Sequence, residues 1–213
     1  MNLKKTLKLY LVTDRQGLCD EEFLNRVGLA CKSGVTLVQL REKELSSRDY
    51  FNLAVKVKLI TDKYDIPLII DDRLDICQAV GADGVHVGDT DLPINVVRKL
   101  LGPNKVIGVS AKSVQSAQEA EKQGADYIGV GAIYPTQTKV VTQHTSIKTL
   151  REISQNVSIP VIAIGGIKEA KIRNLTETGI VGVAMVSEIM KAINIAQKVP
   201  NLLKELHKVV TKE

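Results

Sequence analysis

Short apolar runs recur along the whole chain, and nearly every one ends in charged or small polar residues. The run 37–40 leads into Arg41, and the run 68–70 leads into Asp71. The same change occurs after 161–164, where two glycines follow. Reactive groups placed where successive buried strands end are typical of an enzyme built on a parallel barrel. The pattern therefore indicates both a fold and the position of a site.

Strand-like and helix-like segments alternate eight times without exception. The apolar runs predict strands over 7–13, 36–41, 67–71, 84–88, 105–110, 126–131, 160–164 and 182–187. Apolar residues at helical spacing predict helices over 20–32, 47–63, 73–80, 93–101, 113–123, 146–155, 168–178 and 192–208. Glycine follows several of these helices, as it does in left-handed helix caps.

Eight βα units in 213 residues predict a single (β/α)8 TIM barrel of the phosphate-binding type, with one domain over residues 1–213. An open, doubly wound sheet is the alternative. Such a sheet usually has fewer units and a glycine-rich first turn. The first turn here, 13–17, carries no dinucleotide-binding fingerprint, so the barrel is favoured.

Composition narrows the classes of partner. Aromatic residues make up 3% of the chain and tryptophan is absent, which argues against a base-stacking surface for nucleic acid. The net charge of +5 suits anionic ligands, but Lys and Arg are interleaved with Asp and Glu rather than gathered in a patch. We therefore expect small anionic substrates and no nucleic acid. No statement on oligomeric state follows from these patterns.

Cysteine content and hydropathy predict a cytoplasmic location. Cys19, Cys31 and Cys77 are odd in number, far apart and without metal-site spacing, as in a reducing compartment. The apolar stretch near the N-terminus is too short for a signal peptide and is closed by Asp14. Because no uninterrupted apolar run could span a bilayer, we expect no membrane association.

Three cations follow predicted strands and would converge on the mouth of a barrel. Arg41 and Lys43 follow the second strand, and Lys139 lies in the long segment after the sixth. Arg binds phosphate oxygens in bidentate fashion and Lys acts as a point charge, so the group is suited to a phosphorylated ligand. The alternative is that Arg41 and Lys43 form surface ion pairs with Glu42 or Glu44.

Two carboxylates, Asp72 and Asp91, follow the third and fourth strands. Adjacent strands bring their ends close enough for one hard cation to bridge them. Mg²⁺ usually binds through one or two carboxylates together with substrate phosphates and water. Alternatively, each Asp caps the helix that follows it, and Pro93 supports this for Asp91. Next to the cations, the carboxylate pair favours a site for Mg²⁺ and a polyphosphate.

A second anion site is predicted at the last two strands. Gly165-Gly166 ends the seventh strand and Val186-Ser187 ends the eighth. In phosphate-binding barrels these two loops hold a phosphate through backbone N–H groups. The alternative is that the glycine pair only forms a tight turn. Segment 131–139 is long for a βα connection and rich in hydroxyls and amides, so it is a candidate lid.

Dedicated acid–base machinery is absent from the predicted mouth. The sequence offers no serine elbow and no Cys–His pair there. The histidines, His86, His144 and His207, show no ligand spacing, and His86 within a strand is interpreted as a packed core residue. Charge neutralisers for two anions suit a reaction in which a diphosphate leaves and a phosphorylated partner attacks.

Taken in order, these motifs resemble the thiamine-phosphate synthase family. The resemblance runs from Tyr10 to about Met190 and rests on the following motifs: Gln39-Leu40-Arg41-Glu42-Lys43, Asp71-Asp72, His86-Val87-Gly88 with Asp91, Gly108-Val109-Ser110-Ala111, Thr136-Gln137-Thr138-Lys139, Gly165-Gly166 and Val186-Ser187. The first and fifth of these are specific in combination. The last two are generic to phosphate-binding barrels.

The resemblance implies that hydroxymethylpyrimidine diphosphate and hydroxyethylthiazole phosphate are joined with loss of diphosphate. It implies that Gln39 and Ser110 hold the pyrimidine, with Asp71 beside it, and that Asp72 and Asp91 bind Mg²⁺. Arg41, Lys43 and Lys139 would neutralise the diphosphate and, with Ser110, carry catalysis. The thiazole phosphate would be bound by Thr136, Gln137, Thr138, Gly166, Val186 and Ser187. The family is expected to ionise the pyrimidine C–O bond to a carbocation, which the thiazole nitrogen traps.

The chain departs from the family pattern at three places. The family usually has Asn where Asp71 stands, and Gln where Asp89 stands, so both positions add negative charge near a diphosphate. His144-Thr145 occupies a loop position where Gly is usual. We expect that Asp71→Asn keeps or improves activity.

Two alternatives remain beside the synthase. The related thiazole tautomerases use a His in the segment after the fifth strand, where this chain has Lys112, and tend to lack the acidic pair and the lysine at position 139. A catalytically silent barrel that binds thiazole phosphate is the other, supported only by the added acids Asp71 and Asp89. Dependence of turnover on Mg²⁺ would separate the synthase from both.

Overall fold

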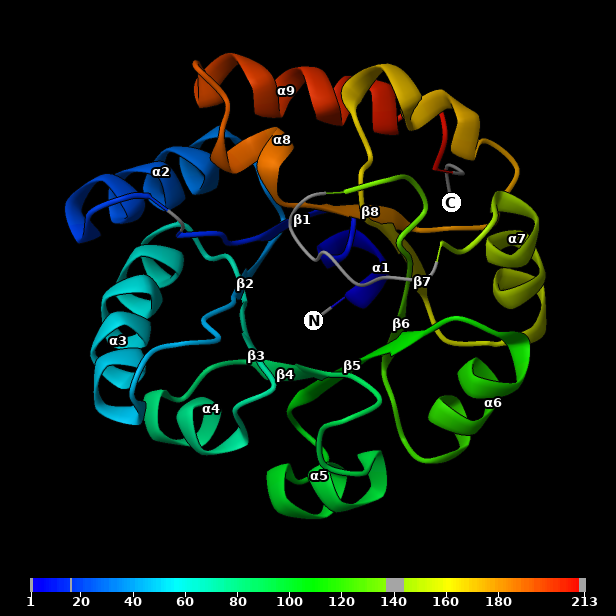
Figure 1. The fold of residues 1–213 in the computed structure, drawn as a ribbon, viewed down its shortest axis with the longest axis horizontal. Coiled ribbons are helices and arrows are strands. Elements are labelled where there is room, and N and C mark those ends of the chain that lie inside the picture. The colour runs from blue at the N-terminus through cyan, green and yellow to red at the C-terminus, as the bar shows by residue number, and fades with distance from the viewer. Residues whose placement is uncertain (1, 16, 137–143, 211–213) are drawn as a thin grey trace.

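The computed structural model describes residues 2–15, 17–136 and 144–210. Its parallel strands close into a barrel in sequence order, and β1 also pairs with β8. The strands are β1 (Leu9–Val12), β2 (Leu37–Leu40), β3 (Leu68–Asp71), β4 (Gly84–Val87), β5 (Val106–Ala111), β6 (Tyr127–Val130), β7 (Val161–Ile164) and β8 (Gly182–Met185). Figure 1 shows the ring of strands with the helices outside it. The predicted (β/α)8 barrel is confirmed, and the open sheet is excluded.

Helices lie outside the ring of strands, except for α1, which lies at the end of the barrel where the strands begin. They are α1 (Leu3–Thr6), α2 (Asp20–Ser33), α3 (Ser47–Lys63), α4 (Leu74–Val80), α5 (Ile94–Leu101), α6 (Val114–Lys122), α7 (Ile147–Asn156), the 3₁₀ helix η1 (Glu169–Leu175), α8 (Ser187–Met190) and α9 (Ile195–Leu206). Gly34 and Gly81 adopt left-handed conformations after α2 and α4, as their positions suggested.

Four elements differ from the sequence prediction. Helix α1 (Leu3–Thr6) was not predicted. The segment 168–178 is a short 3₁₀ helix rather than an α-helix. The eighth strand ends at Met185, and Ser187 already begins α8, a short helix that the apolar run concealed. The last helix begins at Ile195, where the side chain of Asn194 accepts a hydrogen bond from the Gln197 amide, 3.1 Å away. A local cap thus overrode the apolar pattern.

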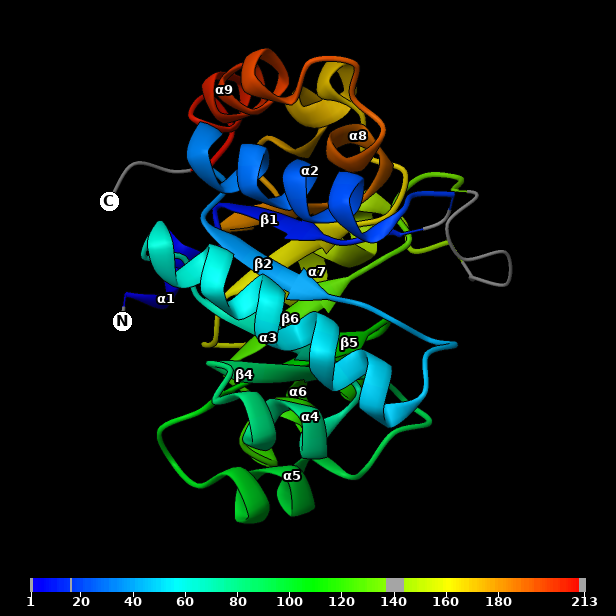
Figure 2. The same cartoon turned by 90° about the vertical axis from the view of Figure 1, so that its left-hand side faces the viewer.

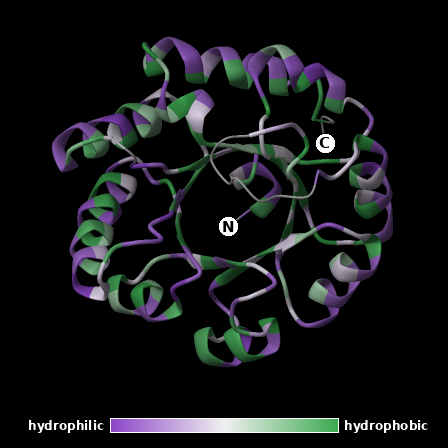
Figure 3. Ribbon diagram, viewed as in Figure 1, coloured by the Kyte–Doolittle hydropathy of each residue, from purple (hydrophilic) through white to green (hydrophobic). Residues whose placement is uncertain are grey.

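Two separate sets of buried side chains hold the barrel together. The larger lies between the strands and the helices and includes Cys31 and Cys77, which are free buried thiols as expected. The smaller fills the lumen and includes Tyr10, Leu37 and Tyr127. Because side chains alternate along a strand, one parity packs outward and the other fills the lumen. Figure 3 shows the apolar ring of strands inside helices with polar outer faces.

The two ends of the barrel differ. Helix α1 lies at the end where the strands begin, and Leu3 packs there on the lumen cluster. The strands all point toward the opposite end, which is therefore the mouth (Figure 2). The residues predicted as reactive follow the strands at this end.

No helix in the described ranges is both long and apolar enough to cross a lipid bilayer.

Candidate active site

The mouth of the barrel encloses a cavity of about 390 Å³. The predicted site residues that line it are Gln39, Arg41, Lys43, Asp71, Asp72, Asp91, Ser110, Thr136, Gly166, Val186 and Ser187. These are all of the predicted site residues within the described ranges. Gln137, Thr138 and Lys139 lie outside the described residues.

Charges at the ends of β2 and β3 are paired with one another. Lys43 Nζ lies 2.8 Å from Asp71 Oδ2 and also forms an ion pair with Asp72. Arg41 Nε is 3.8 Å from the same Asp71 oxygen. The expected alternative, pairing of these cations with Glu42 or Glu44, is therefore wrong for Lys43. The cation group faces the acids of the next strand instead.

Asp71 is the most buried of these acids, at 7% exposure. Its Oδ2 accepts no hydrogen bond of good geometry from any described residue, although Lys43 is within ion-pair distance. A buried carboxylate without full hydrogen bonding is costly unless charges nearby stabilise it. Lys43 and Arg41 supply those charges. Asp71 therefore competes with the expected diphosphate for the same two cations.

Asp72 and Asp91 do not cap helices. Arg73 occupies the cap position of α4 and Pro93 that of α5, and neither helix has a side-chain cap hydrogen bond. Asp91 Oδ2 instead accepts a hydrogen bond from the Gly88 amide at 2.7 Å, which fixes the loop after β4. The capping interpretation is therefore wrong for both residues.

The donor set fits a cation held jointly with a ligand. Within the described ranges, no cluster of three or more His, Cys, Asp or Glu side chains could hold a metal ion. Asp72 and Asp91 nevertheless line one cavity beside Arg41 and Lys43. Two carboxylates plus phosphate oxygens and water are the usual ligands of Mg²⁺, so these residues fit Mg²⁺ accompanying a diphosphate.

The opposite wall of the mouth is made of backbone. Gly165 and Gly166 have φ values of 94° and 65°, and a Cβ on Gly166 would lie 2.4 Å from the Pro135 carbonyl oxygen. The tight turn is therefore enough to explain why both positions are glycine. A role in binding is compatible with the turn, because Gly166 and Ser187 also line the cavity. The amides of Ser187 and Glu188, at the start of α8, have no acceptor within the helix, whereas the Ile189 amide donates to the Val186 carbonyl at 3.1 Å.

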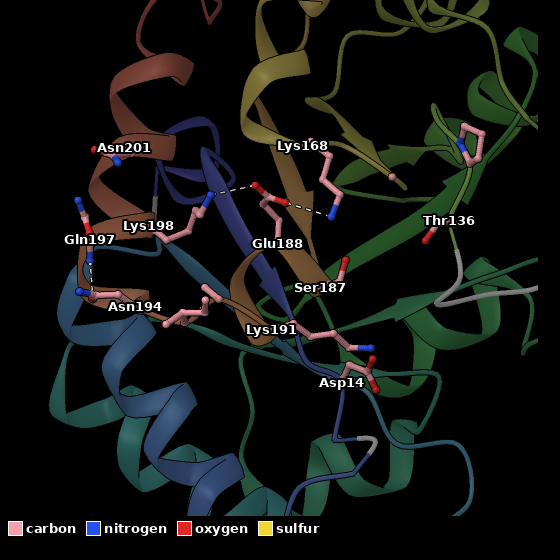
Figure 4. A pocket seen from close by; sticks show the side chains of 14 residues that line it. Asp14, Thr136, Lys168, Ser187, Glu188, Lys191, Asn194, Gln197, Lys198 and Asn201 are labelled. Carbon is pink, nitrogen blue, oxygen red and sulfur yellow. Dashed lines mark hydrogen bonds and ion pairs between the residues drawn. The ribbon is translucent and has the colours of Figure 1, made fainter.

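A wider groove of about 1080 Å³ adjoins this wall and shares Thr136, Gly166 and Ser187 with the mouth cavity. In Figure 4, Glu188 stands between Lys168 and Lys198, each 3.1 Å away. Burial opposes ionisation of Glu188, but its bonds to the two lysines prevail and lower its pKa. Two lysines of this groove, Lys168 and Lys198, are therefore already paired with a carboxylate.

Beneath the charged rim, five side chains form a continuous hydrogen-bonded chain across the lumen. Gln39 Nε2 donates to the Tyr10 hydroxyl at 2.8 Å, and that hydroxyl lies 2.9 Å from the Tyr127 hydroxyl. The Tyr127 hydroxyl is 2.9 Å from His86 Nδ1, and His86 Nε2 is 2.9 Å from Ser110 Oγ. The chain thus joins two predicted site residues, Gln39 and Ser110, from below.

Sequence reasoning missed the middle of this chain. Tyr10 and Tyr127 lie in the predicted strands 7–13 and 126–131 with no role assigned to them, and His86 is predicted as a packed core histidine. His86 is indeed satisfied on both ring nitrogens, but it also lines the cavity. Burial raises the pKa of both tyrosines well above the usual range, so their hydroxyls stay protonated. The sequence did contain one indication of these residues. Side chains with a polar end occur in otherwise aliphatic strands, at positions that face the lumen.

The structure also locates the other departures from the family pattern. Asp89 is exposed at the cavity edge, and Lys112 lines the cavity after β5. His144 is exposed, whereas Thr145 is buried, and its amide donates to the Ala132 carbonyl at 2.9 Å. Thr145 is therefore bonded to Ala132, near the start of the candidate lid.

The fold and this site define a phosphate-binding barrel enzyme: charged side chains surround one half of its mouth and glycine loops the other. Comparison with known proteins is consistent with that class. The family model described as thiamine monophosphate synthase matches residues 9–189. The thiamine-phosphate synthase of Enterococcus faecalis is 58% identical over 202 residues, which cover 95% of each chain. That of Lacticaseibacillus paracasei is 57% identical over 204 residues, 96% of each.

Solved structures agree. A thiamine phosphate pyrophosphorylase from Pyrococcus furiosus superposes with a TM-score of 0.88 at 37% identity, over 99% of this chain and 100% of that one. A 3-hexulose-6-phosphate synthase at 22% identity, with a TM-score of 0.72, shares the fold. The chain therefore belongs to the thiamine monophosphate synthase family. It is an enzyme, a transferase with thiamine-phosphate synthase activity.

Proposed function

We propose that the substrates are hydroxymethylpyrimidine diphosphate and hydroxyethylthiazole phosphate, and that the mouth cavity is where they react. One observation carries the proposal: the described residues that are expected to bind the two substrates, from β2 to β8, line the same cavity. A bimolecular reaction requires both reactants to be held together, and a shared enclosure supplies that proximity.

The pyrimidine is held on the β2 and β5 side by Gln39 and Ser110. Both side chains are fixed by hydrogen bonds from below, Gln39 to Tyr10 and Ser110 to His86. Fixed donors and acceptors orient a flat heterocycle at small entropic cost. The diphosphomethyl group then extends toward the rim, where the charged side chains lie.

Arg41 and Lys43, together with Lys139, neutralise the diphosphate. In the structure Lys43 is bound to Asp71 and Asp72, so diphosphate binding requires the ammonium to exchange carboxylate oxygens for phosphate oxygens. The Thr13 hydroxyl accepts a hydrogen bond from the Arg41 amide at 3.1 Å and holds that backbone in place. Asp72 and Asp91 would hold Mg²⁺, which would supply further positive charge to the diphosphate.

The thiazole phosphate lies on the opposite wall. Gly166, Val186 and Ser187, with Thr136, Gln137 and Thr138 of the candidate lid, bind its phosphate through backbone and hydroxyl donors. This placement leaves the thiazole ring between its own phosphate and the pyrimidine, with the ring nitrogen directed at the pyrimidine methylene carbon.

The reaction breaks one bond and forms one. The pyrimidine C–O bond breaks, its electron pair leaves with diphosphate, and the nitrogen lone pair of the thiazole forms the new C–N bond. No proton needs to be transferred, which suits a mouth without a serine elbow or a Cys–His pair. Charge that develops on the leaving group is stabilised by the surrounding cations, and each tenfold in rate requires about 1.4 kcal/mol of such stabilisation.

We also propose a cytoplasmic location. Two of the three cysteines are buried free thiols, which suits a reducing compartment.

The test is a turnover assay with both precursors, with and without Mg²⁺, that follows thiamine phosphate and released diphosphate. We expect both products in equal amounts, and only when Mg²⁺ is present. Product formed equally well after complete chelation would contradict the Mg²⁺ assignment. Binding of thiazole phosphate without any product would contradict the proposed substrate pair and favour a binding protein.

A further inference from the structure

The buried chain from Gln39 to Ser110 links two residues that contact the pyrimidine in the proposed function. We propose that Tyr10, Tyr127 and His86 are positioning residues. They set which way the Gln39 amide and the Ser110 hydroxyl present hydrogen-bond donors and acceptors, and so select an aminopyrimidine. The inference rests on the proposed pyrimidine contacts of Gln39 and Ser110.

The chain is continuous because each link is within normal hydrogen-bond distance. Its contacts measure 2.8, 2.9, 2.9 and 2.9 Å from Gln39 to Ser110. The five residues come from β1, β2, β4, β5 and β6, so the chain crosses the lumen rather than following one strand. The rings also pack, with the Tyr10 and Tyr127 centroids 6.1 Å apart at 70°.

The lumen is shaped to hold this chain. Tyr10 and Tyr127 are 1% and 0% exposed. A Cβ on Gly108 would lie 2.0 Å from Cζ of Tyr127 and 2.2 Å from its hydroxyl oxygen, so β5 has glycine where the phenol requires space. A Cβ on Gly129 would lie 3.2 Å from the His86 ring. Packing of this kind holds the hydroxyls at fixed points, away from bulk water.

The number of hydrogens available shows which residue donates at each link of the hydrogen-bonded chain. Each tyrosine hydroxyl has one hydrogen to donate, because burial keeps both phenols protonated. Gln39 Nε2 donates to Tyr10, and the Tyr10 hydrogen has an acceptor among these residues only if Tyr10 donates to Tyr127 and Tyr127 to His86 Nδ1. His86 then carries its hydrogen on Nε2 and donates to Ser110, which leaves the Ser110 hydrogen for a ligand.

This direction presents a definite pattern to the cavity. Gln39 Oε1 accepts no hydrogen bond within the described part of the chain, and the residue lines the cavity, so the oxygen is available as an acceptor. Ser110 is left as a donor. An exocyclic amino group donates and a ring nitrogen accepts, so an aminopyrimidine matches both ends. An oxopyrimidine offers the opposite pattern and fits only if the Gln39 amide turns and every link reverses.

The first experiment observes the chain without turnover. The ring nitrogens of ¹⁵N-labelled histidines report the tautomer, and His144→Gln and His207→Gln assign the other two histidine signals. We expect the Nε2–H form for His86 in the native enzyme and a mixture of forms in Tyr127→Phe, which removes the donor to Nδ1 and keeps the ring. A native His86 with its hydrogen on Nδ1, or a tautomer unchanged in Tyr127→Phe, would overturn the inference.

The second experiment is a double-mutant cycle of Tyr127→Phe with Ser110→Ala, because coupling energies isolate residues that act through one another. We expect Tyr127→Phe to lower kcat/KM for the pyrimidine diphosphate about tenfold in the native background, and less than about twofold in the Ser110→Ala background. The KM for thiazole phosphate should stay unchanged. Discrimination against the oxopyrimidine analogue should fall in Tyr127→Phe, because the hydrogen-bonded chain is then interrupted.

A purely structural role predicts something different. Tyr127→Phe would then weaken both substrates alike and in both backgrounds, and that result would overturn the inference. Tyr50→Phe serves as the folding control, because it removes a buried hydroxyl that donates to the Leu40 carbonyl at 2.7 Å outside this chain. Comparison of the two variants by thermal unfolding separates the loss of stability that follows from removing any buried hydroxyl from an effect specific to Tyr127. A native enzyme without turnover would instead overturn the proposed function, and the inference with it.

Discussion

In the proposed function, the two halves of the barrel mouth bind anions by different means. On the β2–β4 side, side-chain charges dominate, and Lys43 is already paired with Asp71 and Asp72. On the β7–β8 side, the cavity is lined by Gly166, Val186 and Ser187, which offer backbone amides and one hydroxyl. One half meets a diphosphate with mobile charges and the other meets a phosphate with fixed dipoles.

The difference follows from what each anion does in the proposed reaction. The diphosphate gains charge as it leaves, so its half requires full charges that can follow that change. The thiazole phosphate does not change its charge in the reaction. A rigid turn that binds it equally well in the ground state and the transition state is therefore enough. Substitutions on the first half should therefore change kcat, whereas substitutions on the second should change the KM for one substrate.

The largest effect is expected for Asp72→Asn. We expect kcat/KM for the pyrimidine diphosphate to fall at least about a hundredfold, roughly 2.7 kcal/mol, because one of two carboxylates for Mg²⁺ is lost. The Mg²⁺ concentration needed for half-maximal rate should rise, as measured by titration of initial rates. Asp75→Asn is the matched control: Asp75 lies nearby in α4, bonded to Arg73 at 2.8 Å, and does not line the cavity. Equal losses in both variants would contradict a metal role.

Gly166→Ala tests the backbone wall. A Cβ there would meet the Tyr134 and Pro135 carbonyl oxygens at 2.5 and 2.4 Å, so the turn must move. We expect kcat/KM for thiazole phosphate to fall about thirtyfold, roughly 2 kcal/mol, with a smaller effect on the pyrimidine diphosphate. Gly81→Ala has a similar φ, 69°, but open space around it, and therefore measures conformational strain alone. Loss of thiazole binding in Gly81→Ala as well would contradict the assignment.

The backbone wall also shows what the sequence could predict and what it could not. Strand alternation predicted the barrel, and the polar residues after the strands predicted Arg41, Lys43, Asp71, Asp72 and Asp91, which line the mouth cavity. Lys112 and Glu188 also line it but were not predicted as site residues. The start of α8 at Ser187 was hidden, because an apolar run followed by Ser reads equally well as the end of a strand. The 3₁₀ form of η1 was likewise invisible, since its apolar spacing over seven residues resembles that of an α-helix.

The lumen chain was missed for a different reason. Tyrosine in a strand has the same hydropathy pattern whether its hydroxyl is solvated or bonded across the lumen. Only the closure of the barrel brings Tyr10 to Tyr127, 117 positions apart in the sequence. The pairing of Lys43 with Asp71 was missed for a similar reason. The sequence predicted that their strands are neighbours, but which of several nearby acids binds one ammonium depends on side-chain geometry.

Ser187→Ala should have a smaller effect than Gly166→Ala, because it removes one hydroxyl and leaves the turn intact. We expect the KM for thiazole phosphate to rise about tenfold, roughly 1.4 kcal/mol, the range for one hydrogen bond to a charged group. The KM for the pyrimidine diphosphate and kcat at saturation should stay the same. A fall in kcat without a change in KM would place Ser187 on the reacting side and break the contrast between the two halves.

A small effect is expected for Asp71→Asn, although Asp71 lies in the centre of the charged half. Its carboxylate holds Lys43 at 2.8 Å and draws Arg41 to 3.8 Å, so it competes with the diphosphate for both cations. The amide removes that competition and a buried charge together, while it keeps the size of the side chain. We therefore expect kcat/KM for the pyrimidine diphosphate to be unchanged or higher in steady-state assays at saturating thiazole phosphate.

A decrease of more than about tenfold, roughly 1.4 kcal/mol, would mean that the Asp71 charge itself takes part in the reaction. Asp89→Gln is the paired variant, because Asp89 is the other added acid but is exposed at the cavity edge. Exposed charges are screened by solvent and salt, so its effect should be smaller still and should vanish as ionic strength rises. If Asp71→Asn gains activity and Asp89→Gln does not, burial next to Lys43, rather than added negative charge in general, limits the charged half of the mouth.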